Sequence, residues 1–312
     1  MSNKEKNFVS AVIYVHNAAN RIEQFLKTVA EVLEENFEHS EIICVNDFSD
    51  DDSVKVIKAV SDTTKETSIS VINMSYFHGL ELSMNAGMDL SIGDFVFEFD
   101  NTTLDFDKIE IMNIYRKSLQ GFDIVSASPS KRGKFTSRLF YRVFGRYAHL
   151  GYQMRTESFR ILSRRVINRI KSMNKTVPYR KAVYANCGLK TDNMLYNTVK
   201  VTGVDSDRQE SRYRTNLAMD SLILFTDLGY TFARNMTFIM ILAAVFTAIY
   251  SLVVYFTGNP VEGWTTTILF LAFSFFGLFG ILTIIIKYLQ IMVNLVFKRQ
   301  RYSFESIEKM TK

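Results

Sequence analysis

The chain has 312 residues, which is room for one large domain or two smaller ones, and its net charge of +5 is modest. Its two cysteines, Cys44 and Cys187, are too few for a disulfide framework or a cysteine metal cluster, so both are predicted to be packing residues. Hydrophobic residues make up 47% of the chain, and they concentrate in two long segments near its C-terminus.

The first part of the chain predicts an α/β fold. Four apolar segments have the composition of buried strands: residues 8–15, 41–45, 69–74 and the stretch that ends at Asp100. Helical spacing of apolar residues separates them, at about 21–36, 53–61 and 79–90. This alternation predicts a doubly wound, mostly parallel sheet. Further elements are expected at these positions: a helix at 108–119, a short strand at 123–127, a helix at 164–173, a strand at 199–204 and a helix at about 215–228.

Polar residues follow the first, second and fourth predicted strands. Because the carboxyl ends of parallel strands meet at one edge of a sheet, Asn17, residues 46–52 and Asp100 are expected to converge on one crevice. A nucleotide-type ligand is the expected occupant of such a place. No Gly-x-Gly-x-x-Gly follows the first strand and no Gly-Lys-Ser/Thr loop occurs, so dinucleotide and P-loop binding are both disfavoured.

Glu98 and Asp100 form an acid pair at the end of the fourth strand. Residues two apart in a strand point to the same face, so both carboxylates are expected to project together from its carboxyl end. Such a pair suits a hard divalent cation that bridges to phosphates. Two simpler alternatives stay open: an acid that caps the following turn, and a salt bridge from Glu98 to a basic residue beneath the site.

A basic block follows the α/β segment. Residues 130–181 contain 15 lysines and arginines and a single acid, Glu157. Arg138, Arg142 and Arg146 recur at intervals of four, so they share one face of a predicted helix with apolar residues off that stripe. We expect this segment to face the anionic surface of a membrane, although a merely solvated basic face is the simpler alternative. Nucleic acid is the poorer partner for a membrane-bound chain.

Two apolar segments of 22 residues, 236–257 and 265–286, contain no charged residue and are predicted to be transmembrane helices. The turn between them has no Lys or Arg, whereas basic residues flank the pair. The positive-inside rule then predicts a multi-pass protein of the inner membrane. Its domain at 1–228, with a membrane-facing segment at 130–181, and its basic tail at 298–312 would both be cytoplasmic. The intervening region, 229–297, would hold the two helices and an interfacial continuation.

Taken together, these segments resemble a family 2 glycosyltransferase of the GT-A fold, in the polyprenyl-phosphate (dolichol-phosphate mannose synthase-like) branch. Residues 12–17 (VIYVHN) resemble its opening strand motif, and residues 45–51 (VNDFSDD) resemble its nucleoside-binding Asp-Asp-Gly-Ser-x-Asp motif. Residues 79–87 (GLELSMNAG) resemble the helix before its metal strand, and Asp100 falls on the first acid of its Asp-x-Asp motif. The resemblance implies a metal-facing role for Asp100 and a nucleotide-binding role for three residues: Asn17, Asp47 and Asp51.

The later part of the chain extends the resemblance. Residues 158–162 (SFRIL) resemble the family's Phe-Arg-Leu step. Arg208, Ser211, Arg212 and Tyr213 match an Arg-x-x-x-Ser-Lys/Arg-Tyr loop that closes over the donor diphosphate, which implies a catalytic role for both arginines. Ser137 and Arg138 resemble a pair assigned to the acceptor phosphate, and three neighbouring residues are expected to assist them: Lys131, Arg132 and Arg142.

The chain departs from the family pattern at several positions. Tyr14 stands in place of Pro, Ala18 in place of Glu and Phe48 in place of Gly. Thr102 occupies the position of the second metal acid, and Leu104 that of a frequent Gln ligand. One carboxylate and a hydroxyl make a poor Mg²⁺ or Mn²⁺ site, so the expected metal would need another ligand. The candidates are three acids: Glu98, Asp105 and Asp107.

The resemblance implies an inverting enzyme that moves a sugar from a nucleotide sugar to a polyprenyl phosphate, such as undecaprenyl phosphate, or to a lipid-linked acceptor. The departures leave open a second class, a catalytically degenerate relative that binds a nucleotide sugar or a partner. A channel or transporter is disfavoured, because neither apolar segment carries an ionisable residue. Gly277 and Gly280 allow close helix contact, so a homo-oligomer is a further alternative.

Overall fold

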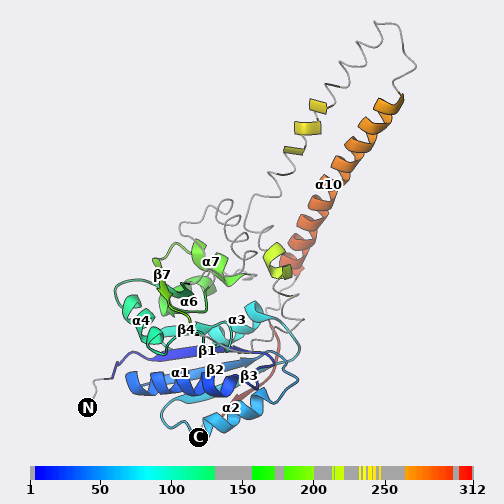
Figure 1. Cartoon of the computed structure of the whole chain (residues 1–312). Helices are drawn as coiled ribbons and strands as arrows, with labels where there is room; N and C mark the ends of the chain where they lie inside the picture. The colour runs from blue at the N-terminus through cyan, green and yellow to red at the C-terminus, as the bar shows by residue number, and fades with distance from the viewer. Residues whose placement is uncertain are drawn as a thin grey trace. The chain divides into compact units, whose positions relative to one another are not determined.

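The computed structural model describes most of the chain, and all structural statements below concern these residues: 4–130, 157–172, 179–199, 213, 215–220, single positions between 232 and 246, 264–297 and 302–310. The chain forms two compact units, which are described separately (Figure 1). The first unit consists of Met1–Ala218 together with Gln300–Lys312, and the second of Met219–Arg299.

The first unit is built on an eight-stranded sheet with the order β7-β5-β6-β4-β1-β2-β3-β8. The central strands β4, β1, β2 and β3 run parallel, β5 and β7 are also parallel, and β6 and β8 run antiparallel to their neighbours. The strands have these bounds: β1 Val9–Val15, β2 Ser40–Asn46, β3 Ser68–Met74, β4 Phe95–Phe99, β5 Ile124–Pro129, β6 Phe159–Ser163, β7 Thr191–Tyr196 and β8 Phe304–Lys309. The predicted mostly parallel α/β sheet is confirmed.

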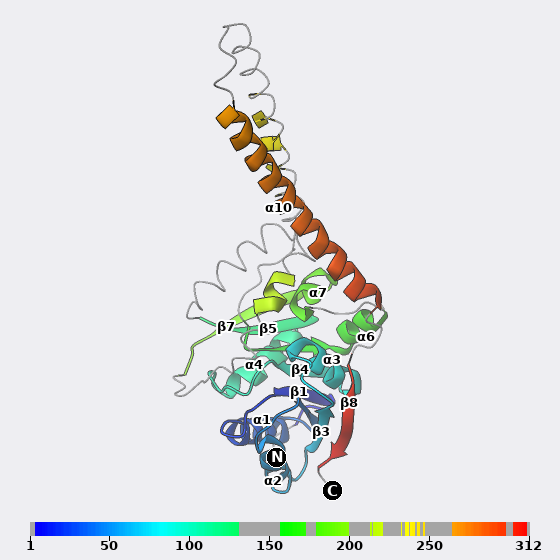
Figure 2. The ribbon, with the colours of Figure 1, turned by 90° about the vertical axis from the view of Figure 1, so that its right-hand side faces the viewer.

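Helices cover both faces of this sheet (Figures 1 and 2). The core on one face holds side chains of α1, α2 and α4, and the core on the other holds side chains of α3, α6 and α7. The central strand β1 supplies both, because Ile13 packs into the first core and its neighbour Val12 into the second. The helices have these bounds: α1 Ile22–Asn36, α2 Ser53–Ser61, α3 Leu80–Leu90, α4 Ile109–Ser118, α6 Arg164–Ser172 and α7 Arg180–Asn186.

Three strands, β6, β7 and β8, were not predicted as strands from the sequence. The late strand expected at 199–204 lies, after residue 199, outside the residues that the structure describes, whereas β7, Thr191–Tyr196, and α7 before it were not predicted. Most β7 side chains are only half-buried, so the strand lacks the apolar run that marks the central strands. The segment expected to be a basic tail, 298–312, contains β8, which pairs antiparallel with β3 and places Ile307 opposite Ile72.

The second unit contains α10, Trp264–Phe297, which includes the predicted apolar segment 265–286. Among the residues that the structure describes, in either unit, no helix is both long enough and apolar enough to cross a membrane. The predicted transmembrane hairpin is therefore not confirmed. Within the unit, Gly277 packs closely on a side chain: a Cβ atom there would lie 1.8 Å from Cε of Met240. Gly280 makes no comparable contact.

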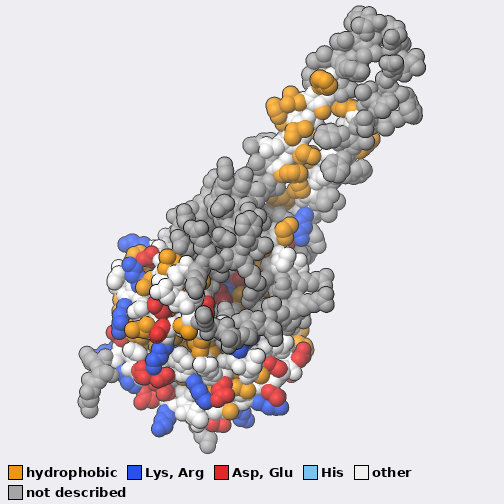
Figure 3. All heavy atoms as spheres, viewed as in Figure 1, with side chains coloured by type: hydrophobic (Ala, Val, Ile, Leu, Met, Phe, Trp, Pro, Cys, Tyr) orange, Lys and Arg blue, Asp and Glu red, His pale blue; other side chains and the backbone are white. Residues whose placement is uncertain are grey.

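Several described side chains of α10 are large, apolar and exposed (Figure 3). They recur at alternating intervals of three and four residues, which places them along one stripe of the helix. The members are Leu271, Phe275, Leu278, Leu282, Ile285, Leu289 and Met292. In the first unit, by contrast, Figure 3 shows acidic and basic side chains interspersed on the visible surface.

Candidate active site

The carboxyl ends of β1 and β2 are adjacent, because Val15 pairs with Asn46 in the parallel register. Asp47, the next residue, is fully buried, and its carboxylate accepts three hydrogen bonds. Its carboxylate accepts from the hydroxyl of Tyr14 at 2.9 Å and from the backbone N–H groups of His78 and Gly79, both at 2.8 Å. Gly79 precedes α3 and has φ +80°, a left-handed conformation that glycine tolerates. Asp47 therefore ties the β1 and β2 ends to the start of α3.

Asn17 and Asp51 tie together the loops that follow β1 and β2. The side-chain oxygen of Asn17 accepts from the backbone N–H of Asp50 at 3.0 Å. The Asp51 carboxylate accepts from the backbone N–H groups of Ala19 at 2.8 Å and Ser53 at 3.0 Å. Partial burial opposes ionisation of Asp51, but the hydrogen bonds from Ser53 and Ala19 outweigh it and hold its pKa below the ordinary value. The three predicted nucleotide residues thus lie at one edge of the sheet.

Asp100 follows β4, which is the neighbour of β1 on its other side. Its carboxylate is ion-paired with two arginines: Oδ2 lies 2.5 Å from Nη2 of Arg160, and Oδ1 lies 2.7 Å from Nη2 of Arg180. The ammonium of Lys181 lies 4.0 Å from Oδ2. Burial opposes the charge of Asp100, but Arg160, Arg180 and Lys181 more than compensate and hold its pKa far below the ordinary value.

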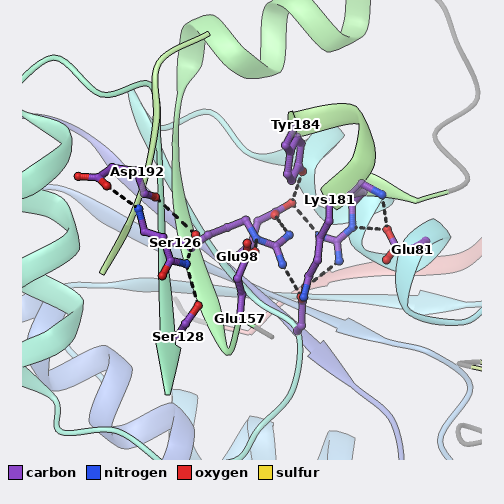
Figure 4. A network of polar contacts seen from close by, with 12 residues as sticks. Glu81, Glu98, Ser126, Ser128, Glu157, Lys181, Tyr184 and Asp192 are labelled. Atoms are coloured by element: carbon purple, nitrogen blue, oxygen red, sulfur yellow. Dashed lines mark hydrogen bonds and ion pairs between the residues drawn. The ribbon is translucent and has the colours of Figure 1, made fainter. Parts of the chain in front are cut away.

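Glu98 lies wholly inside the same network (Figure 4). Its Oε2 accepts from Nη1 of Arg160 at 2.8 Å, while its Oε1 accepts from Nη1 of Arg180 at 2.8 Å and from the hydroxyl of Tyr184 at 2.7 Å. Burial and the Glu98 charge raise the pKa of Tyr184, which keeps this hydroxyl a donor. Of the roles considered for Glu98 from the sequence, the structure therefore shows the salt bridge to basic residues.

Two further carboxylates complete the network. Glu157 binds Nε of Arg160 at 3.1 Å, and Glu81, on α3, binds Nε of Arg180 at 2.9 Å. Both arginine side chains are only 1% exposed, although they belong to the basic block that was predicted to face a membrane. For Arg160 and Arg180 that prediction is wrong, because buried carboxylates from β4, α3 and residue 157 bind them instead.

The described residues do not fit a divalent-cation site. They contain no group of three or more His, Cys, Asp or Glu side chains that could hold a metal. Asp105 accepts from the hydroxyl of Tyr196 at 2.9 Å, and Asp107 accepts from the N–H of Ile109, the first residue of α4, at 3.0 Å. Thr102 is buried, and Leu104 packs against the core. The expected Mg²⁺ or Mn²⁺ remains a prediction from the family resemblance that these contacts do not support.

The remaining site residues lie outside the part of the chain that the structure describes: Lys131, Arg132, Ser137, Arg138, Arg142, Arg208 and Arg212. Conversely, sequence reasoning missed the roles of four residues that surround the acid pair: Glu81, Arg180, Lys181 and Tyr184. One signal pointed to them. Glu98 is a charged residue in the otherwise apolar strand FVFEF, and a buried charge requires a partner, but the sequence does not say which one.

Comparison with known proteins establishes the class of this protein. The family model described as glycosyl transferase family 2 matches residues 10–171, which is more than half of the chain, so the protein belongs to that family of enzymes. Among curated proteins, a prophage bactoprenol glucosyl transferase homolog from Escherichia coli is 27% identical over 85% of this chain and 88% of its own. An uncharacterized glycosyltransferase from Synechocystis is 30% identical over 61% of this chain and 60% of its own.

A solved structure supports the fold. A mannosyltransferase from Pyrobaculum calidifontis, in complex with GDP-Man and Mn²⁺, has a TM-score of 0.51 with 13% identity. The similarity covers 70% of this chain and 63% of that one. At this identity the comparison supports the GT-A type of α/β fold, and its ligands describe that enzyme alone.

Proposed function

We propose that this glycosyltransferase moves a sugar from a nucleotide-sugar donor to a polyprenyl phosphate, in the assembly or modification of cell-surface glycans. The observation that carries the proposal is the convergence of Asn17, Asp47 and Asp51 with Asp100 at the carboxyl ends of three neighbouring strands. The acceptor class is supported by relatives named bactoprenol glucosyl transferase and by one named undecaprenyl-phosphate 4-deoxy-4-formamido-L-arabinose transferase. A lipid-linked sugar is the alternative acceptor.

The proposed reaction requires separate residues for the leaving nucleoside diphosphate and for the acceptor phosphate. A phosphate acceptor is already an anion at neutral pH, so transfer with inversion needs no strong general base. The harder task is to stabilise the leaving nucleoside diphosphate as charge develops on it, and fixed cations do this effectively in a site that excludes water. We assign this task to Arg208 and Arg212. The acceptor phosphate is assigned to a separate basic group: Lys131, Arg132, Ser137, Arg138 and Arg142.

A polyprenyl acceptor places the reaction at a membrane surface. We therefore propose that residues 236–257 and 265–286 anchor the protein in the inner membrane, with residues 1–228 and 298–312 on the cytoplasmic side. Both segments lack charged residues, and the described side chains of α10 form an exposed apolar stripe. Burial of such a stripe in lipid is favourable, since it removes apolar surface from water.

A donor screen tests the proposed reaction. Membranes that contain the overexpressed protein would be incubated with each radiolabelled nucleotide sugar, and the lipid fraction would be separated by thin-layer chromatography. One donor should yield labelled polyprenyl phosphate and released nucleoside diphosphate, and Asp100→Asn should abolish both. A product that migrates as an extended lipid-linked sugar would instead identify the alternative acceptor.

A second candidate function is a non-catalytic relative that binds a nucleotide sugar or a partner. It is favoured by one observation, the saturation of the Asp100 carboxylate by arginines at the position where catalysis in the family uses a metal-facing acid. A purified protein that binds a nucleotide sugar yet releases no nucleoside diphosphate with any acceptor would decide for this function.

A further inference from the structure

The acid expected to face a metal ion is held by fixed cations of the protein. Arg160 from β6 and Arg180 from α7 each bind one oxygen of Asp100, and the Lys181 ammonium lies 4.0 Å from the same carboxylate. Three positive charges from two separate segments thus surround the position that a divalent cation would share with Asp100. A guanidinium can perform the electrostatic task of such an ion, because its charge is permanent and its donors are geometrically fixed.

Both arginines are buried and held rigidly by carboxylates. The Arg180 side chain is only 1% exposed and uses all three nitrogens: Nε binds Glu81, Nη1 binds Glu98 and Nη2 binds Asp100. Arg160 is held equally, by Glu157, Glu98 and Asp100. Both guanidinium groups are therefore fixed in place before any donor arrives. Preorganised charges of this kind need no reorganisation when a ligand binds.

Thr102, which stands where the family pattern has the second metal-binding acid, agrees with a site in which arginines bind Asp100. The side chain of Thr102 is buried, and the other acids nearby have partners of their own, as described above. A second carboxylate beside Asp100 would be needed for a divalent cation, but it would add a fifth acid to a network in which Arg160, Arg180 and Lys181 already face four carboxylates. The charge change at 102 and the two guanidinium groups thus describe one altered site.

We propose that the donor site works without a divalent metal, with Lys181 as the residue that contacts the donor diphosphate and with Arg160 and Arg180 as positioning residues that hold Asp100. This proposal rests on the proposed function and concerns its donor site. Lys181 is the suitable contact residue because its side chain is 11% exposed, whereas the arginines are enclosed. An ammonium group binds phosphate oxygens as a point charge.

Nucleotide binding tests the metal independence directly. Full-length protein in detergent, stripped with EDTA, would be titrated with UDP and with GDP by calorimetry, with and without MnCl₂. We expect one nucleotide to bind in EDTA, with a Kd that Mn²⁺ changes by less than twofold. Paramagnetic resonance of Mn²⁺ should also show no high-affinity bound ion. A tenfold or greater gain in affinity on adding Mn²⁺ would overturn the inference while it upholds the proposed function. If UDP, GDP, ADP, CDP and dTDP all failed to bind under either condition, both the inference and the proposed function would be contradicted.

A pair of variants tests the role of Lys181. We expect Lys181→Met to weaken nucleotide binding at least tenfold in EDTA with an unchanged melting temperature, and Lys181→Arg to restore most of the affinity. Lys117→Met is the matched control, because Lys117 is also a partly exposed lysine, paired with Asp192 at 3.2 Å, and it should bind as the wild type does. Unchanged nucleotide affinity in Lys181→Met would refute the assignment of this residue.

Discussion

At the scale of single residues, Phe48 is held in an unusual backbone conformation. Its φ is +53°, in the left-handed region, and its aromatic side chain is 48% exposed, so packing gives it little in return. A non-glycine residue in this region costs about 1–2 kcal/mol, while glycine loses roughly 0.5–1 kcal/mol through its greater freedom in the unfolded chain. The family pattern has Gly at this position, which agrees with the backbone that the structure adopts.

Phe48→Gly should therefore raise the free energy of unfolding, by up to about 1 kcal/mol, because it relieves the left-handed strain and removes little buried surface. Urea denaturation of the variant and the wild type measures the change. Tyr76→Gly is the matched control, since Tyr76 is exposed in the neighbouring loop but stacks on His78, and this change should lower stability. A loss of stability in Phe48→Gly equal to that of the control would contradict the strain argument.

Glu98→Gln should destabilise the protein strongly. The substitution keeps the size of the side chain but removes the charge that faces Arg160 and Arg180, both enclosed with it. Breaking a buried ion pair on one side costs about 3–5 kcal/mol, because the remaining charge is left uncompensated. Denaturant unfolding would detect the loss. Glu23→Gln, which breaks the exposed pair with Lys27, should change stability little, and an equally small effect of Glu98→Gln would show that the network is dispensable.

The Asp100 carboxyl also makes stability depend on pH. Its pKa is depressed in the folded protein, so it binds a proton more readily when unfolded, where its pKa is about 3.9. The stabilisation is fully present above that value and is lost as the pH falls below it toward the folded pKa. The difference in unfolding free energy between the wild type and Asp100→Asn should hold steady from pH 7 to 5 and shrink below about pH 4. A constant difference down to pH 3 would refute this assignment.

Residue identity alone predicted the edge of the sheet at which Asn17, Asp47, Asp51 and Asp100 lie, since turn and strand patterns fix which residues follow each strand. It did not predict what their side chains contact. Asp47 binds Gly79 and Asp100 binds Arg180, partners 32 and 80 residues away. Such pairings depend on how helices pack onto the sheet, which local sequence patterns do not encode.

At the scale of elements, the strands that the sequence predicted well are the buried central ones. β1 and β2 are largely apolar and almost wholly buried, because helices cover both faces of the sheet. Three strands escaped prediction. β7 and β8 lie at the two edges of the sheet, where one side faces no partner strand, and β6 is a short buried strand between β5 and β4. β8 reads FESIEK and is largely exposed, so its composition is that of a charged tail and only its pairing makes it a strand.

Deletion of residues 302–312 should leave the edge of β3 open. Backbone groups of β3 that now pair with β8 would lose their partners, so the amides that face β8, those of Val71 and Asn73, should exchange hydrogen much faster than in the full chain. Hydrogen exchange read by mass spectrometry measures this effect. The amides of β1, which is paired on both sides, serve as the internal control and should keep their protection. Unchanged exchange in β3 would mean that β8 contributes no protection.

At the scale of the whole molecule, the chain combines a sheet domain with mixed surface charge and a unit whose helix α10 exposes an apolar stripe. The family and the fold of the first unit follow from its sequence pattern, because strand and helix periodicities are local. The arrangement of the second unit does not follow in the same way. Long apolar segments indicate that their side chains favour lipid over water, but they do not indicate how the helices pack.

Cell fractionation tests the proposed anchoring. The full chain should sediment with membranes and resist a carbonate wash, because removal of the uncharged segments 236–257 and 265–286 from lipid would expose a large apolar area to water. A variant that lacks residues 229–297, with a short Gly/Ser linker, should lose this membrane association. Release of the full chain by carbonate would show that the association, if present, is only peripheral.

The pairing of β8 with β3 also bears on how the protein is made. In the sequence, the second unit interrupts the first. The first unit contains residues on both sides of it, Met1–Ala218 and Gln300–Lys312. During synthesis, the β3 edge therefore stays without its partner strand until the inserted unit has been translated and residues 304–309 have emerged from the ribosome. An uncovered edge strand is a template for pairing with other chains. Completion of the second unit thus sets the time for which nascent chains of this enzyme are exposed to misassembly.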